Sequence, residues 1–139
     1  MSKLLHELPL DSASRAPHAR CLTLRSSTLD YQGMAQGIEG FATGIIALGL
    51  GRGERVAIYL PKQFETAIAI FGAARAGCVF VPVNSLLKPA QVAHILRDCN
   101  VRALVTSADR ASSVASELRE CPDLRHLIVV GAESNASAP

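Results

Sequence analysis

Short apolar runs alternate with longer segments of mixed polarity throughout residues 55–130. Runs such as VFVPV and ALV have no polar residue at every second position, a pattern typical of parallel strands that are buried on both faces. In the longer segments the apolar residues recur at helical spacing. This succession predicts an α/β fold with a mostly parallel sheet, right-handed crossovers and helices on both faces. Strands are expected at 55–60, 79–83, 101–106 and 127–130, and helices at 64–75, 89–99 and 111–118.

The first third of the chain predicts short helices and a β-hairpin ahead of one long helix. A leucine cluster predicts a short helix that ends at Pro9, and a second short helix is expected before Pro17, because proline interrupts a helix. Two short strands, 21–25 and 28–31, predict the hairpin. A helix over 33–48 follows, because its apolar residues form a stripe at a spacing of 3.6 residues.

Glycines form a second stripe along this long helix. Each glycine lowers helix propensity by about 1 kcal/mol, so a row of them predicts that another backbone approaches closely. A dimer face in a membrane is the alternative, but Glu39 and Thr43 interrupt the apolar surface that it would need. The glycines of this stripe are Gly33, Gly37, Gly40 and Gly44.

The composition indicates a globular protein without an electrostatic partner. The 139 residues are 49% hydrophobic and 19% charged, with a net charge of +2 and no run of Lys or Arg. Nucleic-acid and membrane-surface partners are therefore not expected. No apolar run approaches the about eighteen residues of a membrane span, and the segment MSKLLHELPLD is too short and polar for a signal peptide, so a cytoplasmic location is expected. Residues 1–131 are expected to be structured, and residues 132–139 to form a disordered tail.

The cysteines and histidines do not have the spacing of a metal or redox site. The four cysteines, at positions 21, 78, 99 and 121, form no CxxC pair and are expected to be reduced thiols that pack as small apolar residues. The four histidines have no cysteine or carboxylate partner at ligand spacing, and His94 is expected to be a partly exposed helix residue. No metal site is predicted.

The glycine-rich segment 49–53 is interpreted as a tight connection between a helix and a strand. Glu54 occupies the position of the third glycine of GxGxxG, and the glycines precede a strand, whereas the dinucleotide-binding loop follows one. No GxxxxGK[ST] and no GxSxG occurs either. We therefore assign no catalytic and no cofactor-binding residue from the motifs.

Taken in order, several short motifs resemble the opening of the large adenylating domain of AMP-forming acyl-CoA synthetases and ligases. The resemblance covers residues 10–131, and residues 1–131 are identified from it as the N-terminal portion of an AMP-binding domain. Gly33, Lys62 and Ser85 depart from the residues usual in the family. The sequences of the segments LPKQFET, VFVPVN and LLKPAQVAHILRDC are most similar to those of the acyl-CoA ligases associated with the exosortase system. The motifs shared with the whole family are TLDY, ALGL with GERVA, LP, RAG, VPVN, ILRDC and ALVT.

The resemblance implies an acid–CoA ligase that uses ATP, Mg²⁺ and CoA. Such an enzyme activates a small-molecule carboxylic acid as acyl-AMP and then transfers the acyl group to the CoA thiol. The phosphate loop, the adenine and ribose motifs and the mobile catalytic lysine of the family do not occur in this sequence, so the chain alone is expected to be inactive. Lys88 follows a strand-end loop and is interpreted as a solvated residue at a helix start, with proximity to a CoA phosphate as the alternative.

Two other functions remain open. The chain has the features expected of the same portion of a peptide-synthetase adenylation domain or another acid–thiol ligase. It is also compatible with a free-standing α/β interaction module that has no catalytic activity.

Overall fold

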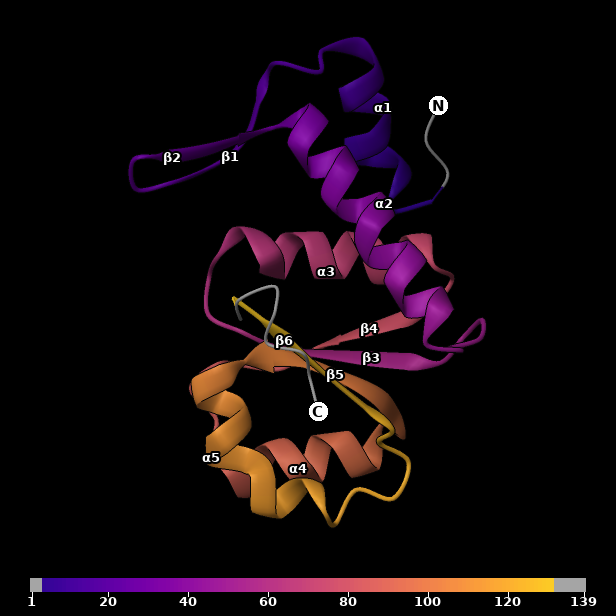
Figure 1. The fold of residues 1–139 in the computed structure, drawn as a ribbon, viewed down its shortest axis with the longest axis vertical. Helices are drawn as coiled ribbons and strands as arrows, with labels where there is room; N and C mark the ends of the chain where they lie inside the picture. Colours follow the sequence, from indigo (N-terminus) through magenta and orange to yellow (C-terminus); the bar gives the residue numbers. More distant parts are fainter. Residues whose placement is uncertain (1–3, 132–139) are drawn as a thin grey trace. The chain divides into compact units, whose positions relative to one another are not determined.

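The computed structural model describes residues 4–131 (Figure 1). The chain divides into two compact units. The first comprises the residues up to 53 together with 62–79, and the second comprises residues 54–61 and those from 80 onward. The predicted tail at 132–139 lies outside the described residues.

The first unit contains helices α1 (Glu7–Arg15), α2 (Tyr31–Ala47) and α3 (Phe64–Arg75) and the strands β1 (Arg20–Leu24) and β2 (Ser27–Asp30). The prediction of two short helices separated at Pro9 is wrong, because one continuous α1 passes through this residue. Pro9 is the third residue of the helix, and the first-turn positions have no helical partner for a backbone N–H, so the missing donor costs nothing there.

The predicted hairpin is confirmed, with strands shifted by one residue. β1 and β2 pair in antiparallel fashion, with Thr23 opposite Thr28. The strand ends at Asp30, whose carboxylate accepts a hydrogen bond from the Gly33 N–H at 2.8 Å. This cap starts α2 at Tyr31, two residues earlier than predicted, because a side-chain acceptor satisfies one of the unpaired N–H groups of the first turn.

The glycines of α2 differ in what they face. A Cβ atom on Gly37 would come within 2.8 Å of Ile68 Cδ1 in α3, and one on Gly72 of α3 within 2.6 Å of Phe41 Cδ1 in α2. The two helices therefore interlock, each placing a bulky side chain on a glycine of the other. Gly40 and Gly44 face open space, so the predicted row of close backbone approaches is wrong for them, and the approach at Gly37 is by a side chain.

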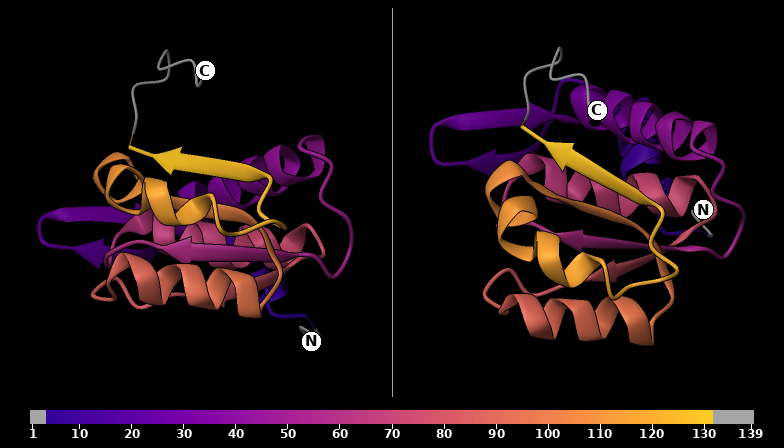
Figure 2. Two further views of the ribbon diagram at one scale, coloured as in Figure 1. Left: turned by 90° about the horizontal axis from the view of Figure 1, so that it is seen from below. Right: turned by 60° about the horizontal axis from the view of Figure 1, so that its bottom comes forward.

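The second unit contains a parallel sheet of the strands β3 (Arg55–Tyr59), β4 (Val79–Pro82), β5 (Val101–Ser107) and β6 (His126–Val130), in the spatial order β4-β3-β5-β6 (Figure 2). All four predicted strands are present, and the α/β fold class with a preceding hairpin is confirmed. α4 (Pro89–Asp98) connects β4 with β5, and α5 (Ala108–Leu118) connects β5 with β6.

The ends of α4 and α5 follow from local chemistry. Pro89 occupies the first position of α4, as predicted, and Asn100 ends the helix region with a left-handed φ of 51°. α5 begins three residues before its predicted start at 111, because the Ser107 hydroxyl accepts a hydrogen bond from the Arg110 N–H at 3.4 Å.

The core of the second unit lies between the sheet and the pair α4 and α5 (Figure 1). Leu104 of β5 packs in one cluster with Val92 and Leu96 of α4 and Val114 of α5. Tyr59 at the end of β3 belongs to the same cluster and is 3% exposed. This packing holds the carboxyl ends of the strands in fixed register, with Tyr59 beside Thr106.

Candidate functional site

Polar side chains gather at the carboxyl ends of β3, β4 and β5, within the second unit. In open parallel α/β sheets ligands bind outside this edge, so it is the natural place to look for a site. Tyr59 ends β3, Thr106 and Ser107 end β5, and the segment 83–88 connects β4 with α4. Arg110 reaches this group from the first turn of α5.

Tyr59 joins two neighbouring elements through its backbone and its hydroxyl. The Thr106 hydroxyl donates to the Tyr59 carbonyl oxygen at 2.7 Å across the register pair of β3 and β5. The Tyr59 hydroxyl in turn donates to the Leu87 carbonyl oxygen at 2.9 Å. Thr106 is fully buried, and a buried hydroxyl is retained only where it has a partner. The first bond joins β5 to β3, and the second ties the segment 83–88 to the sheet.

Arg110 completes the connection with its cationic side chain. The guanidinium carbon lies 5.0 Å from the centre of the Tyr59 ring, a cation–π distance. Its Nη1 donates a hydrogen bond to the Ser85 carbonyl oxygen. Both partners are uncharged, so the positive charge of Arg110 stays uncompensated by a carboxylate within residues 4–131.

The segment 83–88 is a folded loop that leads into α4. Its first residue donates from the Val83 N–H to the Ile58 carbonyl at 3.0 Å, and the Asn84 side-chain oxygen accepts from the Leu86 N–H at 2.9 Å. At its end the Lys88 N–H donates to the Gln91 side-chain oxygen at 2.9 Å, which caps α4. The Lys88 residue is exposed, as expected of a solvated residue at a helix start.

The remaining candidate groups do not form a catalytic or metal centre. All four cysteines are free, and Cys78 and Cys121 are buried. Burial raises the pKa of the Cys121 thiol, and nearby Arg97 offsets the effect only in part, so this thiol is not activated as a nucleophile. Within residues 4–131 no three His, Cys, Asp or Glu side chains come together as metal ligands. No helix in the same range is long and apolar enough to cross a membrane.

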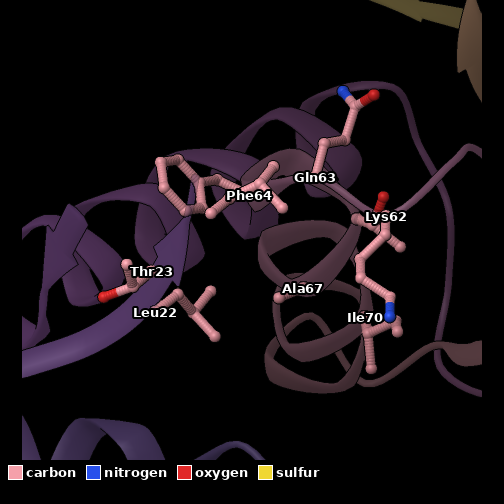
Figure 3. A pocket seen from close by; sticks show the side chains of 9 residues that line it. Leu22, Thr23, Lys62, Gln63, Phe64, Ala67 and Ile70 are labelled. Carbon is pink, nitrogen blue, oxygen red and sulfur yellow. The ribbon is translucent and has the colours of Figure 1, made fainter. Parts of the chain in front are cut away.

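A cavity of about 270 Å³ in the first unit is apolar. Figure 3 shows Leu22 and Thr23 of the hairpin on one side and Phe64 and Ala67 of α3 on the other. Within residues 4–131 its lining includes Lys62, one of the positions that depart from the family pattern, but no acid, histidine or cysteine. This lining offers no group for acid–base or nucleophilic chemistry, so the polar edge of the sheet is the better candidate.

Lys88 was expected from the sequence to be solvated, with proximity to a CoA phosphate as the alternative, and Tyr59, Thr106 and Arg110 were not predicted to be site residues. Tyr59 is the single aromatic residue in the run VAIYL, and Thr106 interrupts the apolar run of β5. The aromatic residue and the threonine each depart from an apolar strand pattern, and this departure could have indicated a polar contact at a strand end. The role of Arg110 had no such signal, because its partners lie far away in sequence.

A model of the protein family described as AMP-binding enzyme matches residues 10–138. A sulfoacetate–CoA ligase of Cupriavidus necator is 33% identical over 103 residues, which cover 67% of this chain and 20% of that enzyme. An L-proline–[L-prolyl-carrier protein] ligase of Pseudomonas fluorescens is 28% identical over 113 residues, covering 81% of this chain and 23% of that enzyme. The chain thus spans about a quarter or less of the length of these relatives.

The fold also matches solved structures. The anthranilate–CoA ligase AuaEII, solved in complex with anthranoyl-AMP, superimposes with a TM-score of 0.88 at 22% sequence identity. The match covers 93% of this chain and 25% of the other. At this identity the likeness shows the fold.

Proposed function

The chain belongs to the AMP-binding enzyme family, and on that premise we propose that it is the N-terminal part of an acid–CoA ligase. The observation that carries this proposal is the match of the family model over residues 10–138, nearly the whole chain. Relatives described as CoA ligases, including the sulfoacetate–CoA ligase, support CoA as the acceptor.

The proposed reaction has two steps and uses ATP, Mg²⁺ and CoA. A carboxylate oxygen attacks the α-phosphorus of ATP, forming acyl-AMP and releasing pyrophosphate. The CoA sulfur then attacks the acyl carbon, and AMP leaves as its bond to that carbon breaks. Magnesium would neutralise the phosphate charge during the first step. The cytoplasm is the proposed location, because ATP and CoA are available there.

The part of the enzyme described here would serve as a scaffold for this reaction. The buried sheet holds Tyr59, Thr106 and the loop 83–88 in fixed positions, and the exposed Lys88 follows that loop. In this proposal Lys88 is available to a CoA phosphate as a point charge.

Pyrophosphate exchange and AMP release test the proposal. The full-length product of the open reading frame that contains this sequence should exchange pyrophosphate into ATP only with an acid present, and should release AMP when CoA is added. The 139-residue chain alone should do neither, because preorganised charge stabilisation is among the largest catalytic terms. Acid-dependent exchange by the short chain would contradict the scaffold role.

A carrier-protein ligase is the second candidate, favoured by the similarity to the L-prolyl-carrier protein ligase. Such an enzyme would show the same exchange but would load a phosphopantetheinyl carrier protein instead of free CoA. If neither acceptor is loaded and no exchange occurs, the chain is better described as a non-catalytic interaction module.

Within the CoA ligases we propose the group associated with the exosortase system. The segments LPKQFET, VFVPVN and LLKPAQVAHILRDC support this assignment. The neighbouring genes test it: exosortase or exopolysaccharide genes beside the open reading frame are expected, and their absence from complete genomes would contradict it.

A further inference from the structure

We propose that Arg110 is a positioning residue for a phosphate-bearing substrate, acting through the loop 83–88 at the carboxyl end of the sheet. This inference rests on the proposed function, which supplies two such substrates, ATP and CoA. Arg110 does not itself bind the substrate in this proposal. Its guanidinium is engaged by the Tyr59 ring and by the Ser85 carbonyl, so it acts by holding the loop.

The loop is held at two of its residues by side chains of the sheet and of α5. Arg110 holds the loop at Ser85, and the Tyr59 hydroxyl holds it at Leu87 at 2.9 Å. Arg110 also packs on the ring of Tyr59, so the two side chains form one latch. The hydroxyl of Thr106, on the neighbouring strand, donates to the Tyr59 carbonyl oxygen at 2.7 Å and so fixes the Tyr59 backbone.

Arg110 is itself held at its backbone and at its side chain. Its backbone N–H donates to the Ser107 hydroxyl at the end of β5, which caps α5, while its guanidinium contacts Ser85 and the Tyr59 ring. Arg110 therefore links the end of β5 to the loop. No carboxylate within residues 4–131 competes for it.

The loop presents positive charge at the carboxyl end of the sheet. It ends in the exposed Lys88, immediately before Pro89 at the first position of α4. The guanidinium of Arg110 and the ammonium of Lys88 both add positive charge at this edge. Together they favour a polyanion over a neutral ligand. Phosphate is the shared chemistry of the two candidate substrates.

The experiment compares four variants in the full-length enzyme. Arg110→Met removes the charge and the hydrogen bonds, Arg110→Lys keeps a cation over the ring, and Tyr59→Phe keeps the ring but loses the tie to Leu87. Arg119→Met is the matched control, because Arg119 is exposed at the other end of α5. Acid-dependent pyrophosphate exchange gives KM for ATP, and AMP release gives KM for CoA.

We expect Arg110→Met to raise one of these two KM values by about tenfold to a hundredfold, since a small misplacement of a binding group has effects of this size. The other KM and the control should stay at the wild-type values. Arg110→Lys should recover part of the loss, and Tyr59→Phe should fall between wild type and Arg110→Met. Which KM changes identifies the substrate held at this edge.

Hydrogen exchange of the Leu86, Leu87 and Lys88 amides provides a second, independent measurement on the 139-residue chain. Faster exchange in Arg110→Met than in the control supports the latch, and unchanged exchange overturns it. Equal losses in both half-reactions with unchanged KM values would overturn the positioning role. If the wild-type enzyme shows neither exchange nor AMP release, the proposed function fails and the positioning role with it, while amide exchange still decides whether the latch exists.

Discussion

The arginine side chains at the two ends of the parallel sheet have different kinds of partner. At the amino ends of the strands, Arg102 Nε lies 3.2 Å from a Glu54 carboxylate oxygen and Arg102 Nη1 lies 3.7 Å from Asp123. At the carboxyl ends, Arg110 contacts a ring and a carbonyl oxygen. One end therefore pairs its cation with carboxylates, whereas the cation at the other end has no carboxylate partner within residues 4–131.

The difference separates a structural ion network from a candidate site. The side chains of Arg102 and its partners are about one-third exposed, so the ion pairs contribute little stability each. Asp123 also accepts a hydrogen bond from the Asn100 amide at 2.7 Å, which completes a closed network. A closed network gains nothing from an added anion, whereas the carboxyl end has a cation without an acidic partner in the described chain.

The largest expected loss of stability comes from substituting Tyr59 at the carboxyl end of the sheet. Tyr59→Leu removes a nearly fully buried ring that carries Arg110, and we expect unfolding free energy to fall by about 3 kcal/mol. Tyr59→Phe should cost about 1 kcal/mol, because only the hydroxyl bond to Leu87 is lost. Urea unfolding of the chain measures both. Equal losses in the two variants would mean that the ring has no role in holding this end.

The next effect concerns the amino end at Asn100. This residue has a φ of 51°, and its amide also binds Asp123. Asn100→Ala should cost about 1–2 kcal/mol, since a left-handed backbone is unfavourable for alanine. Asn100→Gly accepts the backbone and should cost less, which separates the conformational contribution from the hydrogen bond. Thermal and urea unfolding give the comparison, and a glycine variant less stable than the alanine variant would contradict it.

The smallest expected effect is the loss of stability in Arg102→Met. The dependence of this loss on salt is the most direct test of the contrast between the two ends of the sheet. Arg102→Met should destabilise the chain by about 0.5 kcal/mol at low salt, because it removes partly exposed ion pairs. This difference from wild type should nearly vanish in about 1 M NaCl, where charges are screened beyond about 3 Å. The difference caused by Arg110→Met should change little, since its partners are neutral. The same salt dependence for both variants would remove the distinction.

The sequence predicted the elements better than the contacts between them. Helix α3 has the predicted bounds, because apolar periodicity continues up to its ends. α1 and α5 differ because their starts depend on local hydrogen bonding: proline is tolerated in a first turn, and the Ser107 hydroxyl caps α5. Such effects of one residue override periodicity at helix ends.

No site residue was predicted from the sequence: Lys88 was interpreted as a solvated residue, with proximity to a CoA phosphate only as the alternative, and Tyr59, Thr106 and Arg110 were not named as site residues. Tyr59, Thr106 and Arg110 acquire their roles from partners that are distant in sequence, since Thr106 and Tyr59 are separated by 47 positions and Arg110 and Ser85 by 25. Periodicity within one segment carries no information about these pairs. The parallel register that places Thr106 beside Tyr59 is a property of the folded sheet.

The interlock between α2 and α3 constrains how this pair of helices can change in evolution. Ile68 occupies the space of a side chain on Gly37, and Phe41 occupies that of a side chain on Gly72. A larger residue at either glycine therefore requires a smaller residue at its partner, so the two positions of each pair should vary together. Because each helix supplies one glycine and one bulky side chain, sliding of one helix along the other would move both bulky side chains off their glycines.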